Sequence, residues 1–335
     1  MARIRAVQFG CGPVGCGIAR LASQRSGIEL AGAIDIDEDK VGQDLGEMAG
    51  LDEPLGVIIS NDVDAVLSRA RPEIVFHTTS SSFALVHEQL TRIVLAGANI
   101  VSTTEELSFP RPKWPKLSAK IDKLAREHNV TVLGTGINPG FLMDTWPLAM
   151  TAVCQEVKRV RVVRIQDASA RRLPFQKKIG AGCTLKEFSK LVAAGTLRHV
   201  GLAESIAMIA AGLGWELDDI RDEIEPIMAE REVRSEYIAV KPGQAAGVKQ
   251  IGRGLRQGRE LITLDFQASL GAGESYEAVY IEGTPKMEIV IRGGTHGDIG
   301  TAAMVVNAAR RVVAAPPGLV TMNDLPLVTC AAGLG

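Results

Sequence analysis

Residues 4–15, IRAVQFGCGPVG, place three glycines directly after a short apolar run. The run is typical of a buried parallel strand, and Val14–Ser23 is typical of the helix that follows it. Between them, Gly10, Gly12 and Gly15 match the pattern G-x-G-x-x-G. The first glycine permits a tight turn, the second lets the backbone approach a pyrophosphate, and the third lets strand and helix pack closely. This stretch therefore predicts a dinucleotide site.

The predicted site extends on both sides of the glycines. Pro13 and Val14 begin the helix, whose free backbone N–H groups would hold the pyrophosphate. A second strand, Leu30–Ile34, ends at Asp35, where a ribose 2′-hydroxyl would arrive. Strand, helix, second strand and terminal Asp in this order predict a nicotinamide cofactor.

The residues after the second strand bear on the phosphate state of that cofactor. Asp35, Asp37, Glu38 and Asp39 form an acidic run with only Lys40 nearby. A 2′-phosphate would face like charges at short range, so NAD is favoured and NADP stays possible. The same acids also suit the first turn of a following helix.

The bulk composition limits the class of protein. The chain has 335 residues, a net charge of −2 and 46% hydrophobic residues, so it can bury a large core and shows no attraction to nucleic acid or an anionic membrane. No apolar stretch approaches the roughly 20 residues of a membrane span. The five cysteines form no C-x-x-C pair, and the five histidines show no ligand spacing, so we expect a cytoplasmic enzyme without a metal. Cys154 lies in a helical run without a nearby base, so we expect it in the core.

The first part of the chain alternates strand and helix, as in a doubly wound parallel sheet. The predicted strands are Ile4–Phe9, Leu30–Ile34, Val57–Ser60, Ile74–His77, Asn99–Ser102 and Thr131–Gly134, and the longest predicted helices between them are Phe83–Ala96 and Lys116–His128. The final predicted helix, Ile299–Ala314, is expected to pack back on this domain. The dinucleotide-binding domain would then contain residues 1–140 and 297–335.

The pattern changes in the second half, where residues 141–296 are expected to form a substrate and dimerisation domain. Lys158–Gln166 alternates basic and aliphatic residues, which suits a strand with one wet face. The other predicted elements are the helices Thr184–Gly195 and Ala203–Gly214 and the strands Val233–Val240, Leu261–Leu270, Tyr276–Glu282 and Lys286–Ile291. This order predicts an α+β domain whose mainly antiparallel sheet carries helices on one face.

Ligands of open parallel sheets bind beyond the carboxyl ends of the strands, so the loops there are candidates for the site. Five consecutive hydroxyl side chains follow the fourth predicted strand. Thr78, Thr79 and Ser80 are candidate contacts for the nicotinamide ribose. Ser81 or Ser82 is expected to cap the next helix.

Two acids follow the fifth predicted strand. Glu105 and Glu106 come directly after Thr103 and Thr104, and Thr103 is a further candidate cofactor contact. Carboxylates at a cofactor cleft can act as general acid or base once burial raises a pKa. The alternative is the acidic first turn of a helix.

A loop rich in glycine and proline follows the sixth predicted strand. Residues 134–141 contain three glycines and Pro139, which is typical of a rigid turn with close backbone approach. The loop is expected to be a hinge, the floor of the substrate pocket, or both. Asn138, Phe141 and Trp146 are candidate pocket walls.

Several long segments occur in the order seen in a known family. They are Gly10–Gly15, Ser102–Leu107, Gly134–Asp144, Asp167–Gly182, His199–Ser205, Gly297–Asn307 and Pro317–Pro326. On these segments the chain resembles the 2,4-diaminopentanoate dehydrogenases and their relatives, the native amine dehydrogenases. These are more distant kin of dihydrodipicolinate reductase.

The resemblance implies reversible oxidative deamination of an amine with NAD(P), which yields a ketone and ammonia. It implies that a carboxylate of the Glu105–Glu106 pair assists, with Glu105 slightly favoured, and that neither a metal nor a lysine Schiff base is needed. Arg171 is a candidate for a substrate carboxylate, or lies in a solvated loop or subunit contact. The hydroxyl of Thr301 is a candidate substrate contact. The relatives suggest a homodimer formed through the second-domain sheet.

Two alternatives remain at the level of sequence. An imine reductase of the dihydrodipicolinate type would carry paired histidines and a lysine where this chain has Asp167–Ala170. An NAD-binding sensor without turnover is the second, and the intact Glu105–Glu106 pair argues against it.

Overall fold

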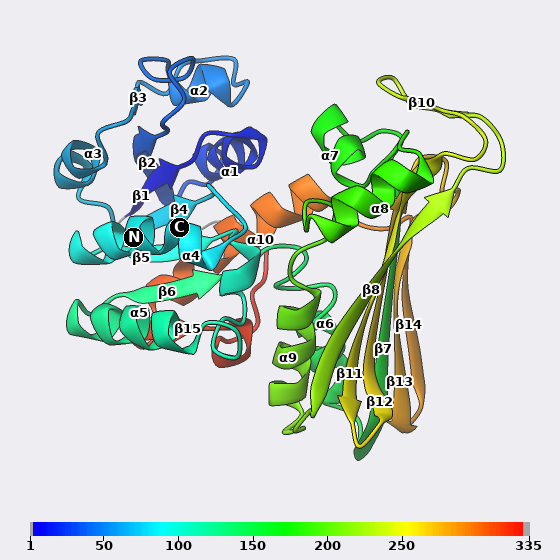
Figure 1. The fold of residues 1–335 in the computed structure, drawn as a ribbon. Coiled ribbons are helices and arrows are strands. Elements are labelled where there is room, and N and C mark those ends of the chain that lie inside the picture. Colours follow the sequence, from blue (N-terminus) through cyan, green and yellow to red (C-terminus); the bar gives the residue numbers. More distant parts are fainter. Residues whose placement is uncertain (1–2, 331–335) are drawn as a thin grey trace. The chain divides into compact units, whose positions relative to one another are not determined.

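The computed structural model describes residues 3–330, and contacts divide the chain into two compact units. The first unit contains the residues up to Phe141 and those from His296 onward, and the second contains Leu142–Thr295. Each unit has its own sheet, a parallel one in the first and a mixed one in the second (Figure 1). The predicted fold class is confirmed.

The first unit is built on a seven-stranded sheet with the order β15-β6-β5-β4-β1-β2-β3. All of its strand pairs are parallel. The strands are β1 Ile4–Phe9, β2 Ile28–Ile34, β3 Ile59–Ser60, β4 Ile74–His77, β5 Asn99–Ser102, β6 Thr131–Gly134 and β15 Gly318–Val320. Four of them coincide with the predicted ranges, because buried parallel strands are continuous apolar runs bounded by turn residues.

Helices cover both faces of this sheet (Figure 1). The helices are α1 Pro13–Ser23, α2 Leu45–Met48, α3 Val63–Ala70, α4 Phe83–Leu95, α5 Pro115–Glu127 and α10 Gly297–Val313, with short 3-10 turns η1 Glu105–Leu107 and η2 Met322–Asp324. On one face, α3, α4 and α5 pack through a core that includes Val7 and Ile34. On the other face, α1 packs through a smaller core that includes Cys16 and Ala33. Helix α10 lies against α1, β5 and β6.

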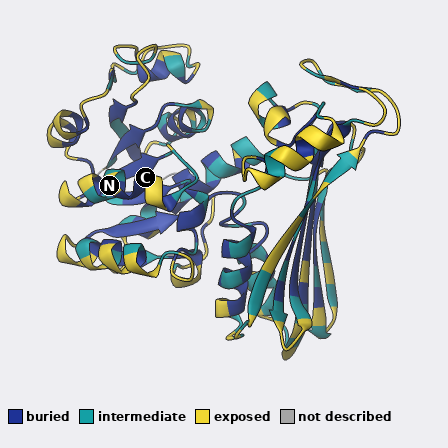
Figure 2. Cartoon of the chain, in the orientation of Figure 1, coloured by how far each residue is buried: buried dark blue, intermediate teal, exposed yellow. Residues whose placement is uncertain are grey.

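The second unit contains a six-stranded sheet with the order β14-β13-β7-β12-β11-β8. Its elements are α6 Thr145–Thr151, β7 Glu156–Asp167, α7 Leu173–Lys178, α8 Leu185–Ala193, α9 Leu202–Gly212, β8 Asp219–Met228, β11 Ala245–Arg256, β12 Arg259–Ser269, β13 Tyr276–Thr284 and β14 Met287–Arg292. Only the β7–β12 pair is parallel in this described sheet. Helix α9 packs on β8, β11 and β12, and Figure 2 shows the buried residues that result along the strands.

Small residues let α9 approach the sheet closely. A Cβ on Gly252 or Gly254 would lie 2.9 or 2.8 Å from the Ile206 side chain of α9. These glycines in β11 also hide the alternating pattern of a strand, and β8 at the sheet edge is polar along most of its length. For these reasons the sequence did not predict β8 or β11.

Three expectations for the second unit are wrong. Residues 233–240 form two short strands, β9 Val233–Arg234 and β10 Ala239–Val240, because the Ser235 hydroxyl accepts the N–H groups of Tyr237 and Ile238 and turns the chain. Cys154 lies beyond the end of α6 and is half-buried, with its thiol 3.8 Å from the Pro285 carbonyl oxygen. The basic–aliphatic alternation of β7 fails at Arg164, which is buried.

Residues 3–330 contain neither a membrane-spanning helix nor a cluster of metal-ligating side chains. No helix in this range is long and apolar enough to cross a membrane. No group of three or more His, Cys, Asp or Glu side chains in this range is placed to hold a metal ion.

Candidate functional site

The turn between β1 and α1 requires its glycines. Gly10 has a φ of +94°, and a Cβ there would lie 2.6 Å from the Thr78 carbonyl oxygen. A Cβ on Gly15 would lie 1.9 Å from the Gly10 carbonyl oxygen. A Cβ on Gly12, the N-cap of α1, would meet no described atom within 4 Å. Two glycines therefore close the turn, and the third leaves open space before the helix.

This open space fits a dinucleotide pyrophosphate. The first helical hydrogen bond of α1 runs from the Cys16 N–H to the Gly12 carbonyl, so the N–H groups before it are available to an anion. Pro13 occupies the first helical turn, where its missing N–H costs nothing. A pocket of about 670 Å³ adjoins Gly12 and extends past Lys40 and the first turns of α10.

Asp35 is buried at the end of β2 and ties that strand to the glycine-rich turn. Its Oδ2 accepts the Cys11 N–H at 2.6 Å, and its Oδ1 accepts the Asp37 N–H at 3.0 Å. The Lys40 ammonium lies 3.4 Å from Oδ2. Each carboxylate oxygen can accept more than one bond, so Asp35 can still receive a ribose hydroxyl.

The hydroxyl loop after β4 makes structural bonds. The Thr78 hydroxyl donates to the Gly10 carbonyl oxygen at 2.7 Å and so holds the glycine turn. The Thr79 hydroxyl contacts the buried His77 ring at 3.0 Å. The Ser80 hydroxyl accepts the Ser82 N–H at 3.3 Å, and the Thr103 N–H donates to the His77 carbonyl. These bonds order the two loops at the carboxyl ends of β4 and β5.

The expected serine cap of α4 is wrong. Ser82 occupies the N-cap position, but within residues 3–330 its side chain makes no capping bond. The Phe83 N–H donates instead to Glu106 Oε2 at 2.9 Å. A carboxylate is the stronger acceptor here because it also meets the positive end of the helix dipole.

Glu106 is a buried anchor. Besides the Phe83 N–H, it accepts the Lys113 ammonium at 2.6 Å and the Trp114 indole N–H at 3.1 Å. Burial acts to raise the pKa of Glu106, but these three donors outweigh it and place the pKa below the ordinary Glu value. Glu106 is therefore held as a carboxylate that joins α4, η1 and the start of α5.

Glu105 is different. It is half-buried on the same turn, and among residues 3–330 its carboxylate has no hydrogen-bond or ion-pair partner. The turn is pressed against the end of β6, where a Cβ on Gly134 would lie 2.4 Å from the Leu107 carbonyl carbon. The backbone of the turn is thus fixed, and the Glu105 carboxylate oxygens can accept hydrogen bonds from a ligand.

The loop after β6 brings further candidates into the first unit. Asn138 and Phe141 lie in it and are half-buried. Thr301 lies within α10, and its Oγ1 accepts the Ile137 N–H at 3.3 Å. Gly300 also packs on this loop, since a Cβ there would lie 2.7 Å from the Ile137 side chain. Thr301 therefore orders the loop.

The remaining predicted substrate residues belong to the second unit. Trp146 is half-buried in α6. Arg171 is 6% exposed, with its guanidinium 4.1 Å from the centre of the Phe175 ring. The buried Gln176 amide donates to the Arg171 carbonyl at 2.8 Å and holds this segment. Arg171 is thus not part of a solvated loop.

Arg164 in β7 is 1% exposed and was not among the site residues predicted from the sequence. Its Nη2 donates to the Thr295 carbonyl at 3.1 Å, and its Nε lies 3.7 Å from the buried Glu277 carboxylate. Among the described residues, Nε and Nη1 have no hydrogen-bond partner. Arg164 falls in phase with Val160 and Val162 on the buried face of its strand, which is the signal that could have found it.

Two family models match the chain. The model of the 2,4-diaminopentanoate dehydrogenase C-terminal domain matches residues 141–334. The model of the dihydrodipicolinate reductase N-terminus matches residues 4–113.

Curated relatives and a solved structure match nearly the whole chain. The 2,4-diaminopentanoate dehydrogenase of Acetoanaerobium sticklandii is 33% identical over 98% of this chain and 94% of its own length. An amine dehydrogenase of Streptomyces virginiae is 26% identical over 99% of both chains. The structure of an amine dehydrogenase from Mycobacterium smegmatis has a TM-score of 0.86 at 28% identity, covering 98% of this chain and 97% of the other.

Proposed function

The chain belongs to the 2,4-diaminopentanoate dehydrogenase family, and from this premise we propose that it catalyses reversible NAD-dependent oxidative deamination of an amine to a ketone and ammonia. In this proposal the first unit binds the dinucleotide through Gly10–Gly15 and Asp35. The second unit supplies substrate contacts. The observation that carries the proposal is the contrast between the occupied Glu106 carboxylate and the available Glu105 carboxylate on one fixed turn.

Glu105 is proposed as the general base. A carbon releases hydride readily only when its nitrogen can push electrons into the developing cation, so the substrate ammonium must first lose a proton. The Glu105 carboxylate accepts that proton and passes it to solvent, so that a charged carboxylate again faces the cationic iminium and stabilises it. NAD, when bound, supplies the hydride acceptor.

Release of the products uses the same group. Water adds to the iminium carbon while the Glu105 carboxylate takes one of the water protons and passes it to the departing nitrogen. As the carbon–nitrogen bond breaks, Glu105 takes the remaining hydroxyl proton and the carbonyl forms. The products are the ketone and ammonia, and the reverse sequence gives reductive amination. Glu106 takes no part in proton transfer, because its donors and its lowered pKa keep it a carboxylate.

The buried guanidinium of Arg164 supports a substrate that carries a carboxylate. Its Nε and Nη1 lack hydrogen-bond partners among the described residues, and unpaired buried donors are costly. A carboxylate is the acceptor whose geometry matches a guanidinium fork. Burial lowers the pKa of Arg164 more than the Glu277 carboxylate raises it, and Arg171, a second buried cation, lowers it further. We therefore propose a diamino acid such as 2,4-diaminopentanoate over a simple alkyl amine.

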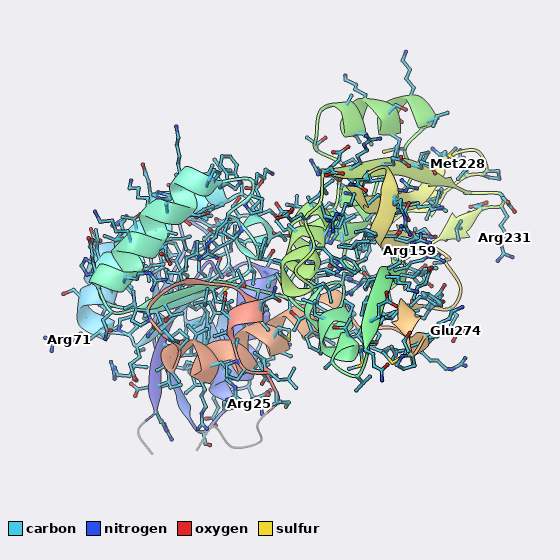
Figure 3. All side chains as sticks on the ribbon, turned by 90° about the horizontal axis from the view of Figure 1, so that it is seen from below. Arg25, Arg71, Arg159, Met228, Arg231 and Glu274 are labelled. Atoms are coloured by element: carbon cyan, nitrogen blue, oxygen red, sulfur yellow. The ribbon has the colours of Figure 1, made fainter. Side chains whose placement is uncertain are left out.

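Oligomeric state and compartment are part of the same proposal. We propose a cytoplasmic homodimer formed through the second-unit sheet, whose face opposite α9 carries Arg159 and Arg161 on β7. Figure 3 labels Arg159 among the side chains of this unit. Arg161 lies 5.5 Å from the ring centre of Tyr280 on the neighbouring strand. Light scattering on Tyr280→Asp should report a monomer, and an unchanged dimer would exclude this face.

The test of the proposed function is NADH formation from NAD with a panel of amines. The panel contains 2,4-diaminopentanoate, cyclohexylamine and 2-aminopentane. Turnover of the diamino acid in strong preference to the others supports the proposal. Turnover of the simple amines alone would support oxidative deamination but would contradict the proposal that the substrate carries a carboxylate. If the protein binds NAD but turns over no amine, the remaining candidate functions are an imine reductase and an NAD-binding sensor.

A further inference from the structure

The loop between β2 and α2, whose course Figure 1 shows, contains an ion pair between Lys40 and Asp37. The Lys40 ammonium lies 2.9 Å from Asp37 Oδ2 and 3.4 Å from Asp35 Oδ2. The Lys40 side chain is 23% exposed, against 44% for Asp37 and 10% for Asp35. Lys40 is therefore shared between a buried and an exposed carboxylate.

The backbone of this loop fixes the arrangement. The Asp37 N–H donates to Asp35 Oδ1 at 3.0 Å, and the Asp39 N–H donates to Asp37 Oδ1 at 3.1 Å. The Lys40 N–H donates to the Asp37 carbonyl at 2.9 Å. These backbone hydrogen bonds form a tight turn that points the Asp37 carboxylate toward Lys40.

The pair lies where the adenosine end of a dinucleotide would sit. Lys40 lines the same pocket as Gly12, and Asp35 joins that turn through the Cys11 N–H. Asp35 occupies the position that binds the ribose hydroxyls in this type of fold. A 2′-phosphate on that ribose would therefore meet Asp35, Asp37 and Lys40 together.

The charges of this group oppose such a phosphate. Two carboxylates and one ammonium carry a net charge of about −1, and a phosphate monoester adds about −1.5 to −2. Lys40 cannot serve the phosphate while Asp37 holds it. We propose that Asp37 discriminates against NADP by holding Lys40 away from the 2′-position of the cofactor.

The protonation states agree with this arrangement. The pKa of Asp37 lies below its ordinary value, chiefly through its hydrogen bond with Lys40. The pKa of Lys40 lies above its ordinary value, chiefly through the same bond. Both groups are therefore charged around neutral pH, where the discrimination would operate.

The chain offers a matched control. Asp39 is exposed on the same loop, and among residues 3–330 its carboxylate has no side-chain partner. Asp37→Asn and Asp39→Asn remove the same charge by the same chemistry two residues apart. Only the first also releases Lys40.

The experiment measures the dissociation constants of NAD and NADP by calorimetry on the full-length enzyme without amine. We expect Asp37→Asn to tighten NADP about tenfold and to leave NAD within about threefold, because one repulsion disappears and one cation is released. Asp39→Asn should change NADP binding less than about twofold. The double variant Asp37→Asn/Lys40→Met should lose the gain.

Three results would overturn the proposal. Equal gains in Asp37→Asn and Asp39→Asn would show a general field effect, and an unchanged NADP affinity in Asp37→Asn would show no discrimination at this residue. Tighter NADP binding that persists in Asp37→Asn/Lys40→Met would show that Lys40 takes no part in the discrimination. Since no amine is present, these results are independent of whether the proposed deamination is correct.

Discussion

At the scale of single residues, two adjacent glutamates with the same chemistry have opposite surroundings. Glu106 accepts hydrogen bonds from a helix N-terminus, an ammonium and an indole, whereas no donor within residues 3–330 bonds to the Glu105 carboxylate. A carboxylate that is already saturated by donors is a poor proton acceptor, because its charged form is the stabilised one. Glu106 instead fixes the three-residue turn η1 through its hydrogen bonds to α4 and the start of α5. Glu105 is held in place because it lies on the same turn.

Glu106→Gln should destabilise the protein by about 2 kcal/mol, since it weakens charge-assisted bonds of a buried group. The folded-state pKa of Glu106 is lowered, so its contribution is present above the ordinary Glu range and is lost as the pH falls through the folded pKa. Urea denaturation should show that the free energies of unfolding of wild type and variant differ at pH 7, and that this difference becomes smaller below about pH 4. A difference in unfolding free energy that does not change with pH would contradict the role of Glu106 as a charged anchor.

Arg164 allows a test of substrate class. In the double variant Arg164→Met/Glu277→Gln both members of the buried pair become neutral, so that neither leaves an unpaired charge. We expect kcat/KM for 2,4-diaminopentanoate to fall about 100-fold, mainly through KM, with any activity on simple amines within about threefold. Equal losses on both substrates would assign Arg164 to folding alone.

At the scale of elements, the turn between β1 and α1 contains one glycine needed for folding, Gly15, and one needed for cofactor binding, Gly12. Gly15→Ala should destabilise the protein by about 2 kcal/mol or more, because its Cβ would lie 1.9 Å from the Gly10 carbonyl oxygen. Gly12→Ala should keep the melting temperature within a few degrees, because its φ of −74° suits alanine and the Cβ meets no described atom within 4 Å. The same Gly12→Ala should weaken NAD binding about tenfold, because the Cβ would occupy the approach to the pyrophosphate. Intact NAD affinity in Gly12→Ala would contradict this placement of the cofactor.

The elements also show how far local sequence determines the site. The glycine motif and Asp35 lie within one βαβ unit, so the pattern alone indicates them. The difference between Glu105 and Glu106 depends on Phe83, 23 residues away along the chain, and no local pattern records that contact. Arg164 depends on Thr295, 131 residues away. Its burial contradicts the ordinary preference of arginine for the surface, so it was read as a residue of a wet face.

At the scale of the whole molecule, the proposed chemistry sets a pH dependence. Alkyl ammonium groups lose protons at about the pKa of lysine, near 10.4, and hydride leaves only from the neutral amine. Deamination by NAD should therefore rise toward alkaline pH, and reductive amination should peak at lower pH. A deamination rate that is flat from about pH 6 to 10 would contradict the proton-transfer step.

The most direct measurement compares NADH formation by Glu105→Gln and Glu106→Gln at saturating 2,4-diaminopentanoate, with NAD affinity determined on the same samples. We expect Glu105→Gln to lower kcat by about 100-fold or more while NAD affinity and melting temperature stay near wild type. Glu106→Gln should lower the melting temperature and retain a larger share of kcat. Full activity in Glu105→Gln, or a loss confined to Glu106→Gln, would contradict the assignment of Glu105 as the base.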